Sequence, residues 1–448
     1  MLITNGKIIT WEKDNQILEG YALRIEKDKI VEVDLQEKLL ERYPQDEKLD
    51  AGGQYVMPGN ICAHTHFYGA YARGLGIPGP APINFTEILG KLWFKLDQSL
   101  TMEDVRYSAL VCMIDAIKHG TTTLIDHHAS PNAIAGSLDE IAQAVEESGV
   151  RAALCYEVTD RGGEERMRAG IDENVRFLNY VKREKPLNGR LAATFGLHAG
   201  LTLSEKTLDI CREALPDDSG FHIHVAEDPA DEYDSLAKSG MRAVDRLFKH
   251  GILGPKTIVA HAVHVDTREI NILADTGTWV THQPRSNMNN AVGIAAVESM
   301  MRAGVKMGLG NDGMSNDMWE EWKATYFVHK LVNRDSRRMS AADIAQMAIY
   351  TNADLVNSLF ETGPVGVLKP GAQADIIFVD YHPFTPLTVG NLPWHIVFGF
   401  HSSMITLTMV DGKVLMKDRE LLTLDEEKIA SEALRNAPGV WERFEKQF

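Results

Sequence analysis

The sequence predicts an α/β protein built on a (β/α)8 TIM barrel, with a small β-sandwich domain formed by the two chain ends. Two observations support this prediction. Short strand-like runs alternate with helical stretches through the middle of the chain, whereas both ends are rich in strand-like runs and turn residues. Alternating strands and helices favour a parallel sheet, and eight such repeats close a barrel.

The N-terminal segment is predicted to be β-rich. Strand-like runs at 2–4 and 7–10 flank Asn5-Gly6, a dipeptide typical of tight hairpins. Two further runs, 21–25 and 29–33, lie on either side of Asp28. We therefore expect these runs to form hairpins.

Eight strand candidates and seven helical stretches follow. The strand candidates are 61–66, 122–126, 152–158, 191–197, 221–226, 257–262, 279–282 and 305–309. The helical stretches are 103–119, 138–148, 172–183, 204–214, 241–250, 269–276 and 295–303. This order is the β-then-α rhythm of a parallel barrel.

The C-terminal part returns to strands. Runs at 374–379 and 405–410 precede Asp411-Gly412, a second hairpin signal, and 413–416 follows it. We expect residues 1–56 and 365–425 to form one composite β-sandwich domain around a hydrolase barrel of residues 57–364. A helical tail over 426–448, interrupted at Ala437-Pro438-Gly439, completes the chain.

Composition excludes several partners. The chain has 46 basic and 63 acidic residues, a net charge of -17, which disfavours binding to nucleic acid but not to a small nucleobase. No apolar stretch approaches the ~20 residues of a membrane helix. The first residues lack the basic and apolar regions of a signal peptide, so we expect a cytoplasmic protein with a small-molecule substrate.

Histidines and acidic residues gather at the predicted strand ends. His64 and His66 end the first barrel strand, and residues two apart on a strand face the same side. His224 ends the fifth strand, His261 ends the sixth and Asp312 follows the eighth. Single histidines on apolar strands are more often core residues. Because barrel active sites lie at the C-terminal strand ends, five such groups together predict a divalent metal site.

The same positions carry motifs that resemble a known family. These are Met57-Pro58-Gly59 before His64-Thr65-His66, Gly120-Thr121-Thr122-Thr123, His224-Val225-Ala226-Glu227, Ala260-His261, Pro284-Arg285-Ser286-Asn287, Gly310-Asn311-Asp312-Gly313 and the run from Gly366 to Asp375. Together they are similar to the amidohydrolase superfamily. The resemblance is to the branch that holds cytosine, guanine and S-adenosylhomocysteine deaminases and the triazine hydrolases, including those like atrazine chlorohydrolase.

The resemblance implies a ligand set and a mechanism. His64, His66, His224 and Asp312 would bind one divalent ion, with Zn²⁺ the first choice and Fe²⁺ the alternative. Glu227 would carry protons, and His261 would hydrogen-bond to the attacking water or the leaving oxygen. Asp312 at the ion can take the proton of a water whose pKa the ion has lowered. The resemblance also implies a homo-oligomer, a dimer or larger.

One absence favours a single ion. Binuclear relatives bridge two metals with a carboxylated lysine at the end of the fourth strand, and the stretch 191–198 contains no lysine.

Substrate contacts are suggested at three positions. The resemblance places Asp97 and His198 at the substrate, but Asp97 could equally precede a helix start at Thr101, and His198 could be a structural histidine. Arg285 could bind a carboxylate or oxo group, although a structural salt bridge is the stronger reading. We expect His127, His128 and His264 to be structural, and we assign no role to Arg73 or His282.

The predicted activity is hydrolytic deamination at a C–NH₂ carbon of a nitrogen heterocycle of the purine, pterin, pyrimidine or triazine type, which releases ammonia. The same site could instead serve dechlorination, N-dealkylation or opening of a cyclic amide. A non-catalytic scaffold is disfavoured because every expected ligand and Glu227 are present.

Overall fold

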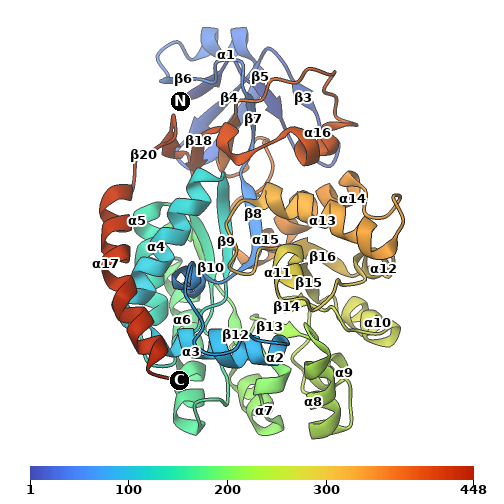
Figure 1. Cartoon of the computed structure of the whole chain (residues 1–448). Coiled ribbons are helices and arrows are strands. Elements are labelled where there is room, and N and C mark those ends of the chain that lie inside the picture. Colours follow the sequence, from blue (N-terminus) through green and yellow to red (C-terminus); the bar gives the residue numbers. More distant parts are fainter.

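The computed structural model describes all 448 residues and confirms the predicted fold class. Figure 1 shows a barrel with helices around it and, at one end, a group of strands drawn from both ends of the chain. No helix combines the length and the apolar character needed to cross a membrane.

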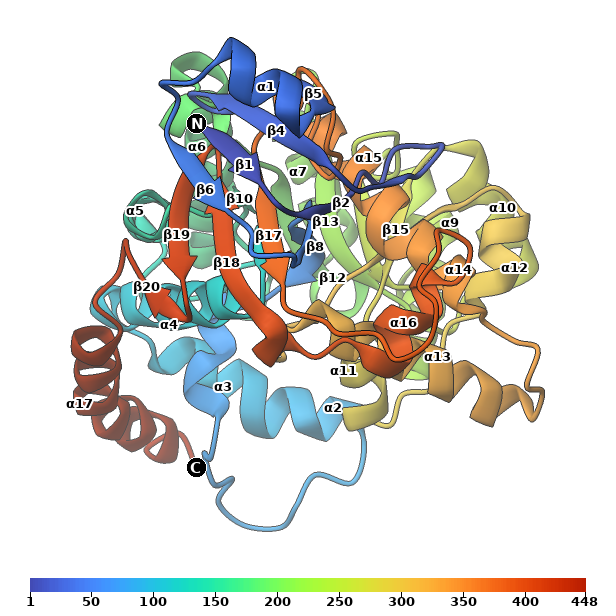
Figure 2. The same ribbon diagram turned by 90° about the horizontal axis from the view of Figure 1, so that it is seen from above.

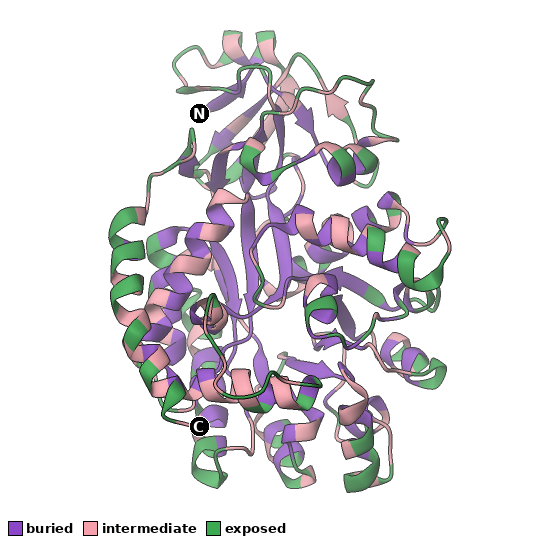
Figure 3. Cartoon of the chain, in the orientation of Figure 1, coloured by how far each residue is buried: buried purple, intermediate pink, exposed green.

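Eight successive strand positions form the barrel. Their bounds are β8 (Asn60–Thr65), β9 (Thr121–Asp126), β10 (Arg151–Leu154), β11 (Leu191–Ala193) continued by β12 (Phe195–Ala199), β13 (Phe221–Val225), β14 (Ile258–His261), β15 (Trp279–His282) and β16 (Lys306–Leu309). Parallel pairing runs from β8 to β11 and from β12 to β16. Most of these residues are buried, as expected where helices cover a parallel sheet (Figure 3).

The first and last barrel strands meet at a seam that a side chain closes. The Asn352 amide nitrogen donates to the Ile61 carbonyl and to the Leu309 carbonyl, each at 2.9 Å. Its carbonyl oxygen accepts from the Leu309 backbone N–H at 2.9 Å. Beyond the strand ends, the Asn311 N–H donates to the His64 carbonyl at 2.9 Å. The seam therefore ties β8 to β16 where two of the predicted metal-binding segments begin.

The helices have the following bounds: α1 (Gln36–Arg42), α2 (Phe85–Ile88), α3 (Phe94–Leu96), α4 (Met102–Lys118), α5 (Ser137–Ser148), α6 (Glu164–Glu184), α7 (Glu205–Ala214), α8 (Pro229–Ser239), α9 (Ala243–Lys249), α10 (Thr267–Asp275), α11 (Pro284–Asn289), α12 (Val297–Arg302), α13 (Met318–Asn333), α14 (Ala341–Ala345), α15 (Asn352–Leu359), α16 (Leu392–Gly399) and α17 (Glu426–Glu445). Local signals set several ends; α4, for example, begins at a capping box between Thr101 and Asp104.

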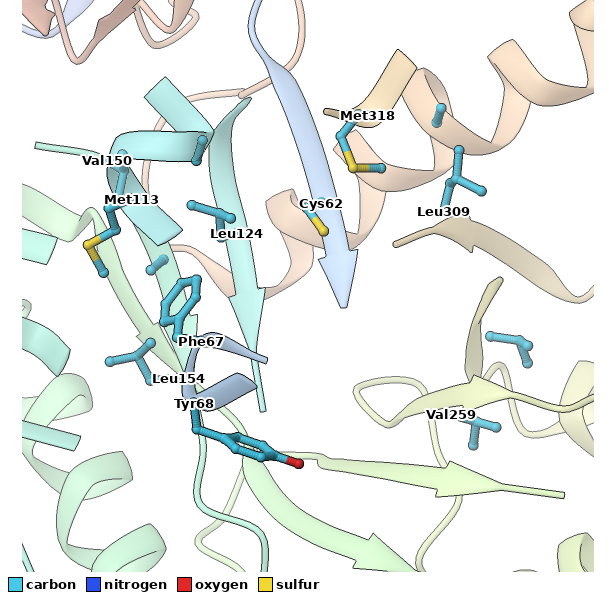
Figure 4. Close-up of a cluster of buried hydrophobic side chains, with 14 of the residues drawn as sticks. Cys62, Phe67, Tyr68, Met113, Leu124, Val150, Leu154, Val259, Leu309 and Met318 are labelled. Carbon is cyan, nitrogen blue, oxygen red and sulfur yellow. The ribbon is translucent and has the colours of Figure 1, made fainter. Parts of the chain in front are cut away.

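A large apolar core lies between the barrel strands and their helices. Figure 4 shows Met113, Leu124 and Leu154 of this cluster on the β9 side, with Leu309 and Met318 on the β16 side. Packing of this kind holds the strand ends, and the side chains they carry, in fixed positions.

Two sheets at the end of the barrel combine strands from both chain ends. The first has the order β5 (Lys29–Leu35), β4 (Tyr21–Glu26), β1 (Leu2–Thr4), β6 (Lys48–Asp50). The second has the order β20 (Glu420–Leu421), β19 (Lys413–Lys417), β18 (Ile405–Val410), β17 (Ile376–Val379), β7 (Tyr55–Pro58), β2 (Lys7–Ile9), β3 (Ile17–Leu18).

A small apolar core joins these two sheets. It includes Ile3 and Leu23 of the first sheet and Val56, Phe378 and Leu407 of the second. Figure 2 shows β17, β18 and β19 beside strands from the beginning of the chain. The domain limits drawn from the sequence stay a prediction.

Two local predictions were wrong, and one helix was not predicted. Asn5 has a positive φ of 56°, as a tight turn requires, but β1 and β2 on either side of it belong to different sheets and form no hairpin. Helix α17 runs without a break through Pro438, since its packing on α4 outweighs the lost hydrogen bond. No helix was predicted over 229–239, where α8 lies, whereas the helix predicted over 241–250 is present as α9.

Candidate metal and active site

The structure brings the predicted metal ligands together at one mouth of the barrel. One ligand atom from each of His64, His66, His224 and Asp312 lies within 4.8 Å of the others. The Asp312 Oδ1 atom is 2.9 Å from the Nε2 atoms of both His64 and His66. The Nε2 atoms of His66 and His224 are 3.1 Å apart. Four nitrogen and oxygen donors therefore face one point.

The remaining ring nitrogens show that these residues suit a cation. Nδ1 of His66 donates to the His127 carbonyl at 2.5 Å, and Nδ1 of His224 donates to the His198 carbonyl at 2.7 Å. With their protons on Nδ1, both rings turn an Nε2 lone pair inward. Two lone pairs 3.1 Å apart repel each other unless a cation lies between them, so the donor set fits a divalent metal ion.

The chain leaves two of these strands in an unusual backbone conformation. His261 has φ 73° and Asp312 has φ 55°, both in the left-handed region that residues other than glycine rarely adopt. Next to Asp312, a Cβ placed on Gly310 would lie 2.7 Å from the backbone nitrogen and oxygen of His64. Close backbone approach at this point brings Asp312 to the histidines of β8, and strain of this kind is common at functional sites.

Glu227 and His261 lie beside the ligand cluster. Glu227 accepts a hydrogen bond from the Asn290 amide at 3.2 Å, and its Oε2 atom is 3.4 Å from His261 Nε2. Nδ1 of His261 contacts Asn287 Oδ1 at 2.8 Å, whereas its buried Nε2 has no hydrogen-bond partner. With the proton on Nδ1, His261 Nε2 is therefore available as an acceptor for the O–H of a water.

Burial shifts the pKa values of these groups. Burial raises the pKa of Glu227 to about 7, although His261 nearby lowers it in part. Burial lowers the pKa of His64 to about 3, so this imidazole is neutral and can act as a ligand. Burial would raise the pKa of Asp312, but His261, His64 and His66 hold it well below its usual range. The site thus contains a neutral imidazole (His64), an ionised carboxylate (Asp312) and a carboxyl group that can exchange protons (Glu227).

A cavity of about 880 Å³, open to solvent, lies over the ligand cluster. Its apolar wall comes mainly from the segment between β8 and α4 and contains Phe85, Leu89, Trp93 and Phe94, with Leu201 from the β12 side. Glu227, Asp312, Ser286 and Asn290 also line it. Aromatic rings beside a polar floor suit a flat heterocycle with polar edges.

Asp97 and His198, the two expected substrate contacts, both line this cavity. Burial raises the pKa of Asp97 to about 6, while Arg161, whose guanidinium is 2.6 Å away, lowers it in part. Thr101 caps α4 with Asp104, so Asp97 has no part in that cap. His198 Nδ1 contacts the Thr202 hydroxyl at 2.8 Å, and that hydroxyl donates to the Ala199 carbonyl, which leaves His198 Nε2 as an acceptor.

Arg285 does not line the cavity. Its Nε atom is 2.5 Å from Glu321, and its other nitrogens donate to the hydroxyl and the carbonyl of Ser315. The guanidinium forms a buried ion pair with Glu321, which connects α11 to α13. These contacts fit the structural salt bridge, the stronger of the two readings drawn from the sequence.

The sequence did not identify Glu157 as a site residue, because it lies in a run interpreted as a core strand. Its carboxylate is buried, lines the cavity and has its Oε1 atom 2.9 Å from His127 Nδ1 and 3.4 Å from His66 Nδ1. A second missed residue is His222, whose Nε2 lies 2.9 Å from Nδ1 of His64. An acidic residue at the end of the third predicted strand was the available signal for Glu157.

The other histidines have structural partners. His128 contacts the Ser130 hydroxyl, and His264 contacts the Val292 carbonyl, both at 2.8 Å. His282 and His329 are buried with their Nε2 atoms 3.1 Å apart. Arg73 ends the short 3-10 helix after β8 and has no contact with the cavity.

Comparisons with known proteins agree on one family. The Amidohydrolase family matches residues 55–415. A 5'-deoxyadenosine deaminase of Methanosarcina mazei is 32% identical over 442 residues, which cover 98% of this chain and 97% of that protein. A 5-methylthioadenosine/S-adenosylhomocysteine deaminase of Acetivibrio thermocellus is 31% identical over 435 residues, 96% of each chain. The crystal structure of an adenosine deaminase from Xanthomonas campestris with bound zinc has a TM-score of 0.84 at 22% identity, covering 99% of this chain and 98% of that one.

Proposed function

The chain belongs to the amidohydrolase family, and from this premise we propose that it is a metal-dependent deaminase whose catalytic groups are Glu227, His261 and Asp312. It is a hydrolase of carbon–nitrogen bonds other than peptide bonds, and it acts on a nitrogen heterocycle. The observation that carries the proposed site is the convergence of His64, His66, His224 and Asp312 beside Glu227 and His261 on the cavity floor.

His64, His66, His224 and Asp312 would hold one divalent ion. Three imidazoles and one carboxylate are a donor set that suits zinc, and Fe(II) is the alternative. When bound, the ion would lower the pKa of a water and so supply a nucleophile near neutral pH.

The protein groups around this position can move the protons that deamination requires. Asp312, held in its ionised form, accepts a proton from the attacking water, and His261 Nε2 hydrogen-bonds to that water. Glu227, with its pKa near neutrality, gives a proton to the ring nitrogen next to the attacked carbon. It then takes the proton of the added hydroxyl group and passes it to the departing amine. The carbon gains a C–O bond, loses its C–N bond and releases ammonia, leaving a ring carbonyl.

The substrate is an aminated heterocycle that lies against the aromatic wall. The two deaminases named above act on adenosine derivatives, and we propose purine nucleosides as the first candidates. The cytoplasmic location and the homo-oligomeric state expected from the sequence stay predictions.

Ammonia release tests this function. Protein stripped with a chelator and reloaded with one equivalent of Zn²⁺ or Fe²⁺ is assayed with 5'-deoxyadenosine, adenosine, guanine, cytosine, pterin and an aminotriazine. We expect turnover of at least one compound only after reloading. Glu227→Gln should bind metal normally and lose about 10²- to 10⁴-fold in kcat.

The matched control is Glu173→Gln, which changes a buried, ion-paired carboxylate on α6 away from the cavity and should leave kcat unchanged. A fully active Glu227→Gln protein, or the release of chloride or alkylamine in place of ammonia, would contradict the proposal.

A further inference from the structure

Side chains at helix α11 contact all three proposed catalytic groups. The pairs are Ser286 with Asp312, Asn287 with His261, and Asn290 with Glu227. Asn290 directly follows the helix, and its backbone N–H donates to the Ser286 carbonyl at 2.8 Å. Because residues four apart share one face of a helix, the side chains of Ser286 and Asn290 lie next to each other. The third pair concerns the group that carries the proton.

The neighbours of Asn290 set the orientation of its amide. The Ser286 hydroxyl directs its proton to Asp312, so only lone pairs of Ser286 Oγ face Asn290 Nδ2, which is 3.4 Å away. On the other side, Asn289 Nδ2 donates to the Asn290 amide oxygen at 3.1 Å. A reversed amide would place its oxygen against the Ser286 lone pairs. The NH₂ end of Asn290 therefore faces both Ser286 and Glu227.

This orientation makes the two oxygens of Glu227 unequal. Asn290 is the one hydrogen-bond donor to this carboxyl group, and it donates to Oε1 at 3.2 Å. The carboxyl proton favours the oxygen that accepts no hydrogen bond, which is Oε2. Oε2 lies 3.4 Å from His261 Nε2, and that nitrogen is 3.8 Å from Asp312 Oδ2. The oxygen that Asn290 leaves free is thus the one beside the metal-ligand cluster.

We propose that Asn290 is a positioning residue for deamination: its amide holds Oε1 of Glu227 and so directs Oε2, the oxygen that exchanges the proton, toward the reacting ring. Asn290 acts through Glu227, and its contribution is the donated hydrogen bond and not the space that it fills. The inference rests on the proposed function and adds a residue to the same site.

Two substitutions separate hydrogen-bond donation from packing. Asn290→Asp keeps the size of the side chain but replaces the donating NH₂ group by an oxygen, which would face Oε1 of Glu227 and repel it. Asn290→Leu keeps the branched skeleton and neither donates nor accepts. The control is Asn357→Leu on α15, which removes two hydrogen bonds to Val365 away from the cavity.

Kinetics of ammonia release are measured on zinc-loaded protein with a substrate that the wild type turns over. We expect kcat to fall about 10- to 100-fold in Asn290→Leu and at least as far in Asn290→Asp, because a displaced acid transfers its proton poorly. KM should stay within about threefold of the wild-type value, and Asn357→Leu should keep the wild-type kcat. Packing alone predicts the opposite order, with Asn290→Asp the milder change.

A second comparison tests whether Asn290 acts through Glu227. In protein that already carries Glu227→Gln, either substitution of Asn290 should change kcat by less than about twofold, because the group that Asn290 positions is gone. A further loss of tenfold or more in this background would show that Asn290 acts on something else and would overturn the inference.

Crystal structures of the zinc-loaded wild type and both Asn290 variants, without substrate, test the inference without turnover. We expect Asn290 Nδ2 within hydrogen-bond distance of Glu227 Oε1 in the wild type, and a carboxyl group rotated away from His261 in both variants. If the wild type releases no ammonia, the proposed function fails, and these structures still decide the role of Asn290. An unmoved Glu227 carboxyl group, a wild-type kcat in Asn290→Asp, or a raised KM with kcat unchanged would overturn the role.

Discussion

Replacement of Asn352 by leucine should loosen the barrel at its seam. The side chain is fully buried and makes three hydrogen bonds of 2.9 Å to the backbones of β8 and β16. Leucine has the same branched skeleton, although it is larger, and it cannot hydrogen-bond. The carbonyls of Ile61 and Leu309 and the N–H of Leu309 would each lose this partner.

The size of the effect follows from those three groups. A buried polar group left without its partner costs roughly 1–3 kcal/mol, so three such groups cost on the order of 3 to 9 kcal/mol if the terms add. We expect the lower part of this range, because neighbouring groups can adjust together. Total stabilities of roughly 5–15 kcal/mol make this a large loss. Since His64 lies in one tied strand and Asp312 follows the other, zinc affinity should also fall by about 10- to 100-fold.

Two measurements check this prediction. Urea unfolding followed by circular dichroism gives the free energy of unfolding, and competition with a chromophoric chelator gives the zinc dissociation constant. The control is Asn357→Leu on the same helix, which removes two hydrogen bonds to Val365 but leaves the seam intact. It should lower stability without changing zinc affinity. An Asn352→Leu protein within 1 kcal/mol of the wild type, with the same zinc affinity, would refute the reasoning.

Three further predictions concern other positions. Gly310→Ala should weaken zinc binding tenfold or more in chelator competition, because its Cβ would lie 2.7 Å from the His64 backbone; Gly254→Ala, with open space around its Cβ, should not. Burial lowers the pKa of His329 from 6.5 to about 4, so between these pH values the unfolded state binds more protons at this histidine. Its contribution to the free energy of unfolding should fall by roughly 3 kcal/mol as pH drops from 6.5 to 4, measured as the difference in pH dependence between the wild type and His329→Gln. Arg151→Met should lower the free energy of unfolding in urea by about 3–5 kcal/mol, because the fully buried guanidinium pairs with two carboxylates that would lose their counter-charge.

Specific results would contradict each of these. Equal zinc affinity in the two glycine variants would show that the backbone approach at position 310 can relax. An equal change in the free energy of unfolding between pH 6.5 and 4 in the wild type and His329→Gln would mean that the buried histidine charges without cost. A stable Arg151→Met protein would mean that its two acidic partners are neutralised or solvated.

The barrel and the convergence of most candidate metal ligands could be predicted because their signals are local and repeated. Each of the eight strands is an apolar run followed by a helix, and His64, His66, His224, His261 and Asp312 stand where those runs end. Parallel strands bring their C-terminal ends to one mouth, so positions along the chain were enough to group these residues.

Features that depend on contacts between distant segments could not be predicted in this way. Asn5-Gly6 has the local chemistry of a hairpin, but pairing with β4 and β7 sends its two flanking strands to different sheets. Arg285 follows a strand end, but its guanidinium forms an ion pair with Glu321 on a later helix. In the sequence, Glu157 is one more residue of a predicted strand. Only the structure shows that His66 and His127, from other strands, lie beside its carboxylate.

The position of β7 in its sheet has a consequence for how the chain is made. This strand pairs with β2 from the beginning of the chain on one side and with β17 on the other. During synthesis on the ribosome, the early strands emerge long before β17 and its neighbours. One long edge of the first-made sheet therefore stays open to solvent, exposed to aggregation or to a chaperone, until nearly the whole polypeptide has been translated.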